Sequence, residues 1–140
     1  MARLEFFVVA ESVSVDQFTN QVSVFSILEE IRAEHFPIAI SHCVGMSLWR
    51  SETGDFDQDF QAVLRVTSPG LPPRDVSTNF RFAPSGLRMR VIQRVVGVRV
   101  EQEGDLVFEL LLNGHHIAEH VITVQRAEPV DVIASSAVSE

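Results

Sequence analysis

Apolar and polar residues alternate along most of this chain, and only an extended strand presents such a period of two as one apolar face. Between Ile38 and Leu48, every second residue is apolar except His42. Valine, isoleucine, phenylalanine and threonine, which favour strands, recur throughout the alternating segments. No stretch of comparable length has the longer period of an amphipathic helix. The pattern therefore predicts an all-β fold.

Turn-forming residues divide the alternating pattern into about eight short strands. We expect these strands at residues 3–14, 21–28, 38–50, 56–67, 76–82, 87–101, 106–112 and 115–125. The last two are joined by Asn113-Gly114, a dipeptide that strongly favours a tight hairpin turn. Gly97 indicates a bulge or a bend within its strand. Phe56 and Phe60 are expected to share one face of theirs.

Residues 28–35 are compatible with two structures. The preceding strand pattern can continue through them and stop before Pro37. The segment from Ser26 to Glu29 also matches a capping box, in which serine and glutamate side chains satisfy the first N–H groups of a helix. A short helix that ends before Pro37 is therefore the alternative.

Many short strands without a long helix are typical of a two-sheet antiparallel β-sandwich, here with about eight strands and at most one short helix. A barrel is the alternative. We expect one domain over residues 1–130. Residues 131–140, which are small and polar, are expected to form a flexible tail.

Composition excludes several classes of protein. Of the 140 residues, 46% are hydrophobic and 21% are charged, which excludes intrinsic disorder as the main state. The formal net charge of −8 argues against general nucleic-acid binding, because phosphate contacts need a basic surface. Cys43 is the single cysteine, so the chain has no internal disulfide framework. The apolar run Phe6–Ala10 is shorter than a signal peptide or a membrane span requires. We expect a cytoplasmic protein without membrane association.

Two segments carry a resemblance to known groups of proteins. The first contains Ala10–Asp16, Asn20, Val22–Ile31 and Phe36-Pro37, and the second contains Glu103–Glu109 and Asn113-Gly114. The first resembles an uncharacterised bacterial family of small β-sandwich domains of unknown function. The second resembles the closing hairpin of immunoglobulin-like and C2-like sandwiches. The resemblance implies a sandwich fold and no particular reaction.

The sequence from His116 to His120 matches H-x-x-E-H, a signature of zinc proteases in which both histidines bind zinc from one helix. Here the motif follows a hairpin turn and continues into Val121–Val124, so it belongs to a strand. On a regular strand the two histidines share a face about 13 Å apart, from a rise of roughly 3.3 Å per residue. That distance is too long for one zinc ion, and His116 remains only a weak metal candidate.

Asp55, Asp57 and Asp59 form a D-x-D-x-D sequence that is similar to the beginning of a calcium loop. Phe60 stands where such a loop needs glycine, and Arg65 or Val66 stands where it needs a bidentate acid. The three aspartates are therefore weak metal candidates, and a solvated acidic face is the expected alternative. No cofactor is expected.

A catalytic role for Cys43 would require a base beside the thiol. His42 is adjacent in sequence, but neighbouring residues of a strand point to opposite faces. We therefore expect Cys43 to be a buried core residue. The sequence contains no P-loop, no nucleophile elbow and no dinucleotide-binding glycine motif, and we expect no catalytic residues.

Charge is segregated along the chain. Residues 1–60 carry 3 arginines against 10 acidic residues (−7), residues 61–100 carry 7 against one (+6), and residues 101–140 carry one against 8 (−7). The candidate binding residues are the basic side chains on or next to predicted central strands, Arg81, Arg88, Arg90, Arg94 and Arg99. Arg88, Arg90 and Arg94 have the same strand parity and are expected on one face. They would suit an anionic or acidic partner, or a self-complementary interface with the acidic segments of the chain. The alternative is a solvated face neutralised by neighbouring strands.

We expect a non-enzymatic module that binds another protein, a second copy of itself included. The first strand supports this expectation, because Phe6 and Val8 on one face alternate with Phe7 and Val9 on the other. One alternative is a domain or an enzyme that binds an anion or a small ligand through the central arginines. Another is a structural component of a bacterial or phage assembly.

Overall fold

The computed structural model describes residues 1–84 and 86–128, and the expected tail at 131–140 lies outside them. The described residues form strands joined by turns and contain no helix, so none is present there that could cross a membrane. The strands are β1 (Arg3–Val15), β2 (Val22–Ile27), β3 (Glu30–Ala33), β4 (Ile38–Arg50), β5 (Phe60–Thr67), β6 (Arg74–Phe80), β7 (Arg88–Val100), β8 (Gly104–Leu112) and β9 (His115–Arg126).

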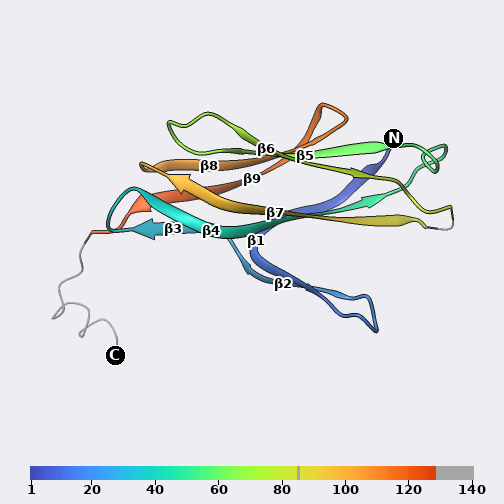
Figure 1. Cartoon of the computed structure of the whole chain (residues 1–140), viewed down its shortest axis with the longest axis horizontal. Coiled ribbons are helices and arrows are strands. Elements are labelled where there is room, and N and C mark those ends of the chain that lie inside the picture. Colours follow the sequence, from blue (N-terminus) through green and yellow to red (C-terminus); the bar gives the residue numbers. More distant parts are fainter. Residues whose placement is uncertain (85, 129–140) are drawn as a thin grey trace.

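The strands form two sheets that face each other, which confirms the predicted sandwich (Figure 1). One sheet has the order β2-β1-β4-β7 and the other has the order β3-β9-β8-β5-β6, and neither closes into a barrel. The predicted hairpin across Asn113-Gly114 joins β8 to β9. All pairs are antiparallel except β3 with β9, which run parallel. The alternating pattern did not predict this parallel edge.

Two local predictions are settled by the observed strand limits. Residues 28–35 contain β3 and no helix, so the capping-box alternative is wrong there. Phe56 and Phe60 do not share a strand face, because β5 begins only at Phe60. Asp57 has a φ of 68°, which interrupts the extended backbone, and Phe56 is exposed on the turn before it.

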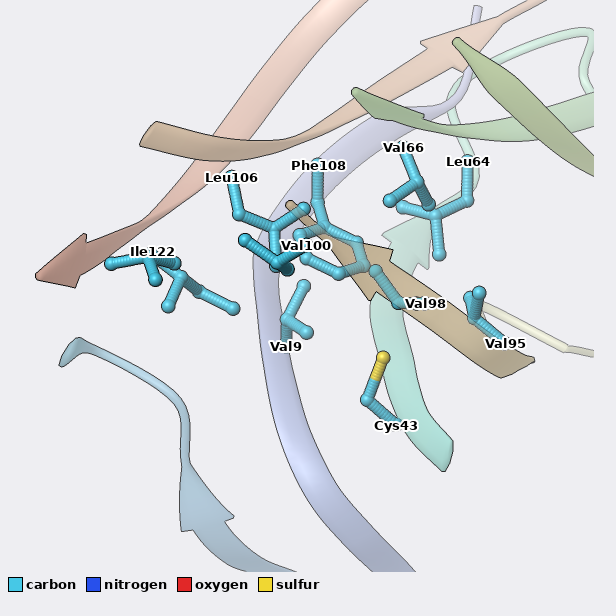
Figure 2. Packing of buried hydrophobic residues seen from close by; sticks show 11 residues of the cluster. Val9, Cys43, Leu64, Val66, Val95, Val98, Val100, Leu106, Phe108 and Ile122 are labelled. Carbon is cyan, nitrogen blue, oxygen red and sulfur yellow. The ribbon is translucent and has the colours of Figure 1, made fainter. Parts of the chain in front are cut away.

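The core between the sheets consists of two clusters of apolar side chains. Figure 2 shows one of them, in which Val9 and Cys43 of one sheet meet Phe108 of the other. The second cluster surrounds Trp49, whose ring stacks on that of Phe80 with centroids 6.0 Å apart. Residues from both sheets contribute to each cluster, so burial of apolar surface holds the two layers together.

Gln93 of β7 is a polar side chain that lies buried between the sheets. Its Nε2 donates hydrogen bonds to the carbonyl oxygens of Ala62 (3.0 Å) and Val76 (3.1 Å) in the opposite sheet. Both amide hydrogens are therefore used, and the cost of burying the amide is offset. The contact also fixes β7 relative to β5 and β6.

Gly97 shifts the alternation of β7 by one residue. Val91 and Val95 face the core before it, and Val98 and Val100 face the core after it. The φ of +70° at Gly97 produces this change, and because the pairing of β7 with β4 keeps one register past this point, it is a bend rather than a bulge, the second of the two predicted alternatives. Both halves of the long strand can thus cover the same core.

Candidate binding cleft

The first hairpin leaves the sandwich and forms a separate projection. β1 pairs with β4 over Arg3–Ala10 and with β2 over Ala10–Val15. Beyond Ala10 the two strands continue without β4, and Figure 1 shows them as the blue hairpin below the sheets. We call residues 11–27 the hairpin arm. Its turn begins at Asp16, whose carboxylate accepts hydrogen bonds from two backbone N–H groups, and these bonds lower the pKa of Asp16.

The hairpin arm exposes several large apolar side chains. Phe18 at the turn is 89% exposed, Val15 is 41% exposed, and Phe25 and Ile27 are each 51% exposed. A two-stranded ribbon has no interior in which to bury such side chains. The arm therefore presents apolar surface to its surroundings, and that surface is available to another molecule.

The end of the hairpin arm is tied back to the sheet. Arg90 of β7 donates from Nη2 to the backbone oxygen of Asn20 at 2.9 Å. Two hollows lie between the arm and the outer face of the sheet, of about 410 and 430 Å³. Arm residues Glu11–Val13 line the first together with His42–Val44, Arg94 and Val96, and Asn20 lines the second together with Leu48 and Arg88–Arg90. We call the two hollows together the arm cleft.

Buried apolar side chains lie on the same outer face of the sheet as the arm cleft. Val44 and Met46 of β4 are buried, yet neither belongs to either core cluster. Each alternates with residues that face the core, and Met46 pairs with Ile92 across the β4–β7 ladder. Apolar material therefore covers the outer face of this sheet as well as its inner face. Phe6 and Val8, one of the two apolar faces of β1, lie on this side, because they pair with Leu48 and Met46.

Three of the predicted binding residues lie together on this outer face. Arg88, Arg90 and Arg94 share one side of β7, opposite Arg50, Leu48 and Val44 of β4. The Arg88 guanidinium pairs with Glu5, and this pair lowers the pKa of the Glu5 carboxyl. Arg90 contacts only the neutral oxygens of Asn20 among the hydrogen bonds of the described residues.

Arg94 is exposed and lines the first hollow. Among residues 1–84 and 86–128 it takes part in no ion pair. His42 lies on the same face, because it pairs with Val96 two positions along β7. The arm cleft thus combines an apolar floor with guanidinium groups that have hydrogen-bond donors to spare.

The other two predicted arginines line neither hollow and are neutralised by neighbours. Arg81 follows β6 and contacts Asp57 at 3.0 Å and Asp59 at 2.8 Å. Arg99 pairs with Glu101 at 2.7 Å. The solvated-face alternative therefore describes these two residues, and the five predicted arginines do not form one site.

The weak metal candidates are engaged in other contacts. Asp55 is buried and accepts the Glu52 N–H at 2.7 Å, and it lies 3.2 Å from the amino group of Met1. Asp57 and Asp59 both pair with Arg81. In the part of the chain that the structure describes, no three His, Cys, Asp or Glu side chains are grouped to hold a metal ion.

His116 and His120 point to opposite faces of β9, so the predicted shared face is wrong. A bulge changes the register between Leu110 and Leu111, which leaves Ile117 without a partner. His116 lies outside, 3.9 Å from Glu109 and Glu119. His120 lies between the sheets, where its Nε2 is 2.5 Å from the carbonyl oxygen of Leu28. Because a carbonyl only accepts, Nε2 of His120 carries the hydrogen.

Cys43 is buried in the core, as predicted. Burial raises the pKa of its thiol to about 11, so the nucleophilic thiolate is scarce at neutral pH. His42 lies on the other face of β4 and does not contact the sulfur as a base would. This environment is typical of a structural cysteine.

Comparison with protein families identifies the family of the chain but gives no activity. The family model of DUF6941, a family of unknown function, matches residues 5–125. The chain belongs to DUF6941. The predicted resemblance to an uncharacterised domain family is thereby confirmed. No curated protein matches the chain.

The match to DUF6941 includes the hairpin arm and the three arginines of the arm cleft. The sequence of this DUF6941 domain indicated the hairpin through the turn-forming residues between Asp16 and Asn20. It did not indicate that the hairpin leaves the sheet, nor that its turn reaches Arg90. The available signal was the apolar character of both faces of β1, which a strand inside one sandwich does not need.

Proposed function

We propose that this DUF6941 domain is a non-enzymatic module that binds another protein through the hairpin arm. The observation that supports this proposal is the exposure of four large apolar side chains, Val15, Phe18, Phe25 and Ile27, on one projecting hairpin. Exposed apolar surface is unfavourable in water and marks interaction sites, and here it lies on both faces of the hairpin, because Phe25 is opposite Ser12 and Val15 is opposite Val22. Aromatic side chains contribute strongly to binding when a partner buries them.

The edge position of β2 adds a second kind of contact. β2 is the last strand of its sheet, so one side of its backbone has no neighbouring strand in the described fold. Such an edge can pair with a strand of a partner. A partner that covers the arm can therefore combine apolar contacts with backbone hydrogen bonds.

The proposal includes a second copy of this chain among the possible partners and places the domain in the bacterial cytoplasm. The core supports the cytoplasmic location, because it is built without a disulfide and contains Cys43 as a buried free thiol. Cell fractionation with an antibody against the domain would test the location, and recovery outside the cytoplasm would contradict it.

Affinity capture with matched variants tests the interaction. Phe18→Ser combined with Phe25→Ser removes the aromatic surface of the arm, whereas Phe56→Ser combined with Val121→Ser removes exposed apolar side chains elsewhere. The wild-type and control baits should retain the same protein from the source cell, and the arm variant should retain about tenfold less of it. Circular dichroism should show that all three baits are folded. Equal retention by all three baits would overturn the proposal.

A further inference from the structure

We infer that the arm cleft takes an extended acidic peptide segment of the protein partner. In this arrangement two carboxylates four residues apart pair with Arg90 and Arg94, and an apolar side chain between them lies over Ile92. The inference rests on the proposed function and adds the chemistry of the segment that the partner inserts.

Charge complementarity favours an acidic segment. Arg50, Arg88, Arg90 and Arg94 lie on the outer face of this sheet, whereas Glu5 and Glu11 are the acidic side chains of the cleft and its border. The face is thus locally basic on a chain whose net charge is −8. A partner segment with carboxylates is attracted here and repelled by the acidic remainder of the molecule.

The two arginines are free to accept new partners to different extents. Arg94 has no ion pair within the described residues, and Arg90 uses part of its guanidinium for the neutral oxygens of Asn20. A guanidinium group carries five N–H donors, so Arg90 retains donors for a carboxylate. Neither arginine must give up an acidic neighbour in order to bind.

Spacing favours an extended chain over a compact anion. Arg90 and Arg94 are four positions apart on one strand, with Ile92 between them on the same face. A rise of roughly 3.3 Å per residue separates their Cα atoms by about 13 Å. An extended peptide has the same rise, so residues i and i+4 reach the two arginines and residue i+2 meets Ile92. A compact anion such as inorganic phosphate reaches one arginine at a time.

The shape of the cleft agrees with a segment that lies between two surfaces. Ile92 is half-buried and lies on β7 between the arginines that line the two hollows, so the residue at i+2 meets an apolar side chain there. Val13 of the arm lines the first hollow opposite this face. The residues at i+1 and i+3 of a bound segment therefore point toward the arm or the solvent.

Fluorescence anisotropy with short labelled peptides tests this inference. The probe is Ser-Glu-Thr-Val-Thr-Glu-Ser, with its glutamates four residues apart. One control peptide replaces both glutamates by glutamine, and another, Ser-Glu-Glu-Thr-Val-Thr-Ser, keeps the composition but places them side by side. The probe should bind about tenfold more tightly than either control, because charge-assisted hydrogen bonds to both arginines require charge and spacing. Its affinity should fall as salt is added.

Protein variants locate the site. Arg90→Gln and Arg94→Gln should each weaken probe binding about tenfold. Arg99→Gln, on the same strand but paired with Glu101, should leave binding unchanged. An equal loss with Arg99→Gln, or equal binding of the side-by-side peptide, would overturn the inference in favour of nonspecific charge attraction.

The failure of this inference can be distinguished from that of the proposed function. Absence of probe binding up to about 1 mM, an affinity too weak for recognition by a short segment, would overturn the inference alone if the arm variant still loses the captured protein. If the probe does not bind and the arm variant also retains the captured protein as well as the wild type does, both the inference and the proposed function are overturned.

Discussion

At the scale of single residues, the side-chain amide of Gln93 should contribute to the free energy of unfolding through its two hydrogen bonds to the opposite sheet. Replacing it with leucine leaves the carbonyl oxygens of Ala62 and Val76 without this donor inside the sandwich. We expect Gln93→Leu to lower the free energy of unfolding by about 1–3 kcal/mol. Urea denaturation measures the loss. Gln61→Leu, at an exposed position of β5, is the control and should change stability by about 0.5 kcal/mol or less; equal effects would contradict the proposed role of Gln93.

Cys43 gives a second prediction at this scale, and it depends on pH. The pKa of its thiol is raised by burial to about 11, so the folded state favours the protonated form more than the unfolded state does. This contribution to stability is complete below about pH 9 and is lost as the pH rises toward 11. A disulfide reagent such as DTNB should therefore react with Cys43 at about pH 8 only after denaturation. Rapid stoichiometric reaction of the folded protein would show that the thiol is accessible.

At the scale of strands, Gly97 lets one long strand face the core on both sides of a bend. Its φ of +70° disfavours any L-residue, although no atom lies within 4 Å of a Cβ at this position. We expect Gly97→Ala to cost about 1–2 kcal/mol from backbone strain alone. Gly97→Asn should cost less, because asparagine tolerates this conformation, and Gly97→Val should cost more. Thermal unfolding of the three variants checks the order, and equal costs would exclude strain as the cause.

The strands themselves follow from the local pattern, whereas their bulges and partners depend on tertiary contacts. Alternation predicted the limits of β4 and of the β8–β9 hairpin closely, although Val44 and Met46 of the alternating set in β4 lie on the outer face of the sheet and not in the core. Alternation assumes an unbroken period, so it placed His116 and His120 on one face and missed the bulge at Ile117. Alternation also did not predict the parallel pairing of β3 with β9, because a strand of four residues has no sequence feature that identifies the strand it pairs with.

The candidate site shows the same division between local pattern and tertiary structure. Strand parity placed Arg88, Arg90 and Arg94 on one face of β7, as the structure confirms. The neutralisation of Arg81 depends on which acidic residues the fold brings beside it. No local sequence feature contains that information, because Arg81 pairs with residues more than twenty positions away.

At the scale of the whole molecule, the basic central segment is divided between two sheets. Residues 61–100 form β5 and β6 of one sheet and β7 of the other. The arginines of this segment are therefore divided into two groups. One group is paired with acidic residues, as Arg65 is with Asp75, and the other lies beside the hairpin arm. The molecule thus presents an apolar projection and a basic cleft side by side, and the two surfaces should respond to salt in opposite ways.

This opposition gives a prediction for the isolated protein. We expect it to self-associate weakly at high concentration through the exposed side chains of the hairpin arm, and added salt should maintain or strengthen the contact because apolar burial is not screened. Sedimentation equilibrium should show an average mass that rises with protein concentration. The Phe18→Ser/Phe25→Ser variant should abolish the rise, and the Phe56→Ser/Val121→Ser control should preserve it. A strict monomer would remove self-association from the proposed function, whereas a mass that falls with salt would assign the contact to the arginines rather than to the arm.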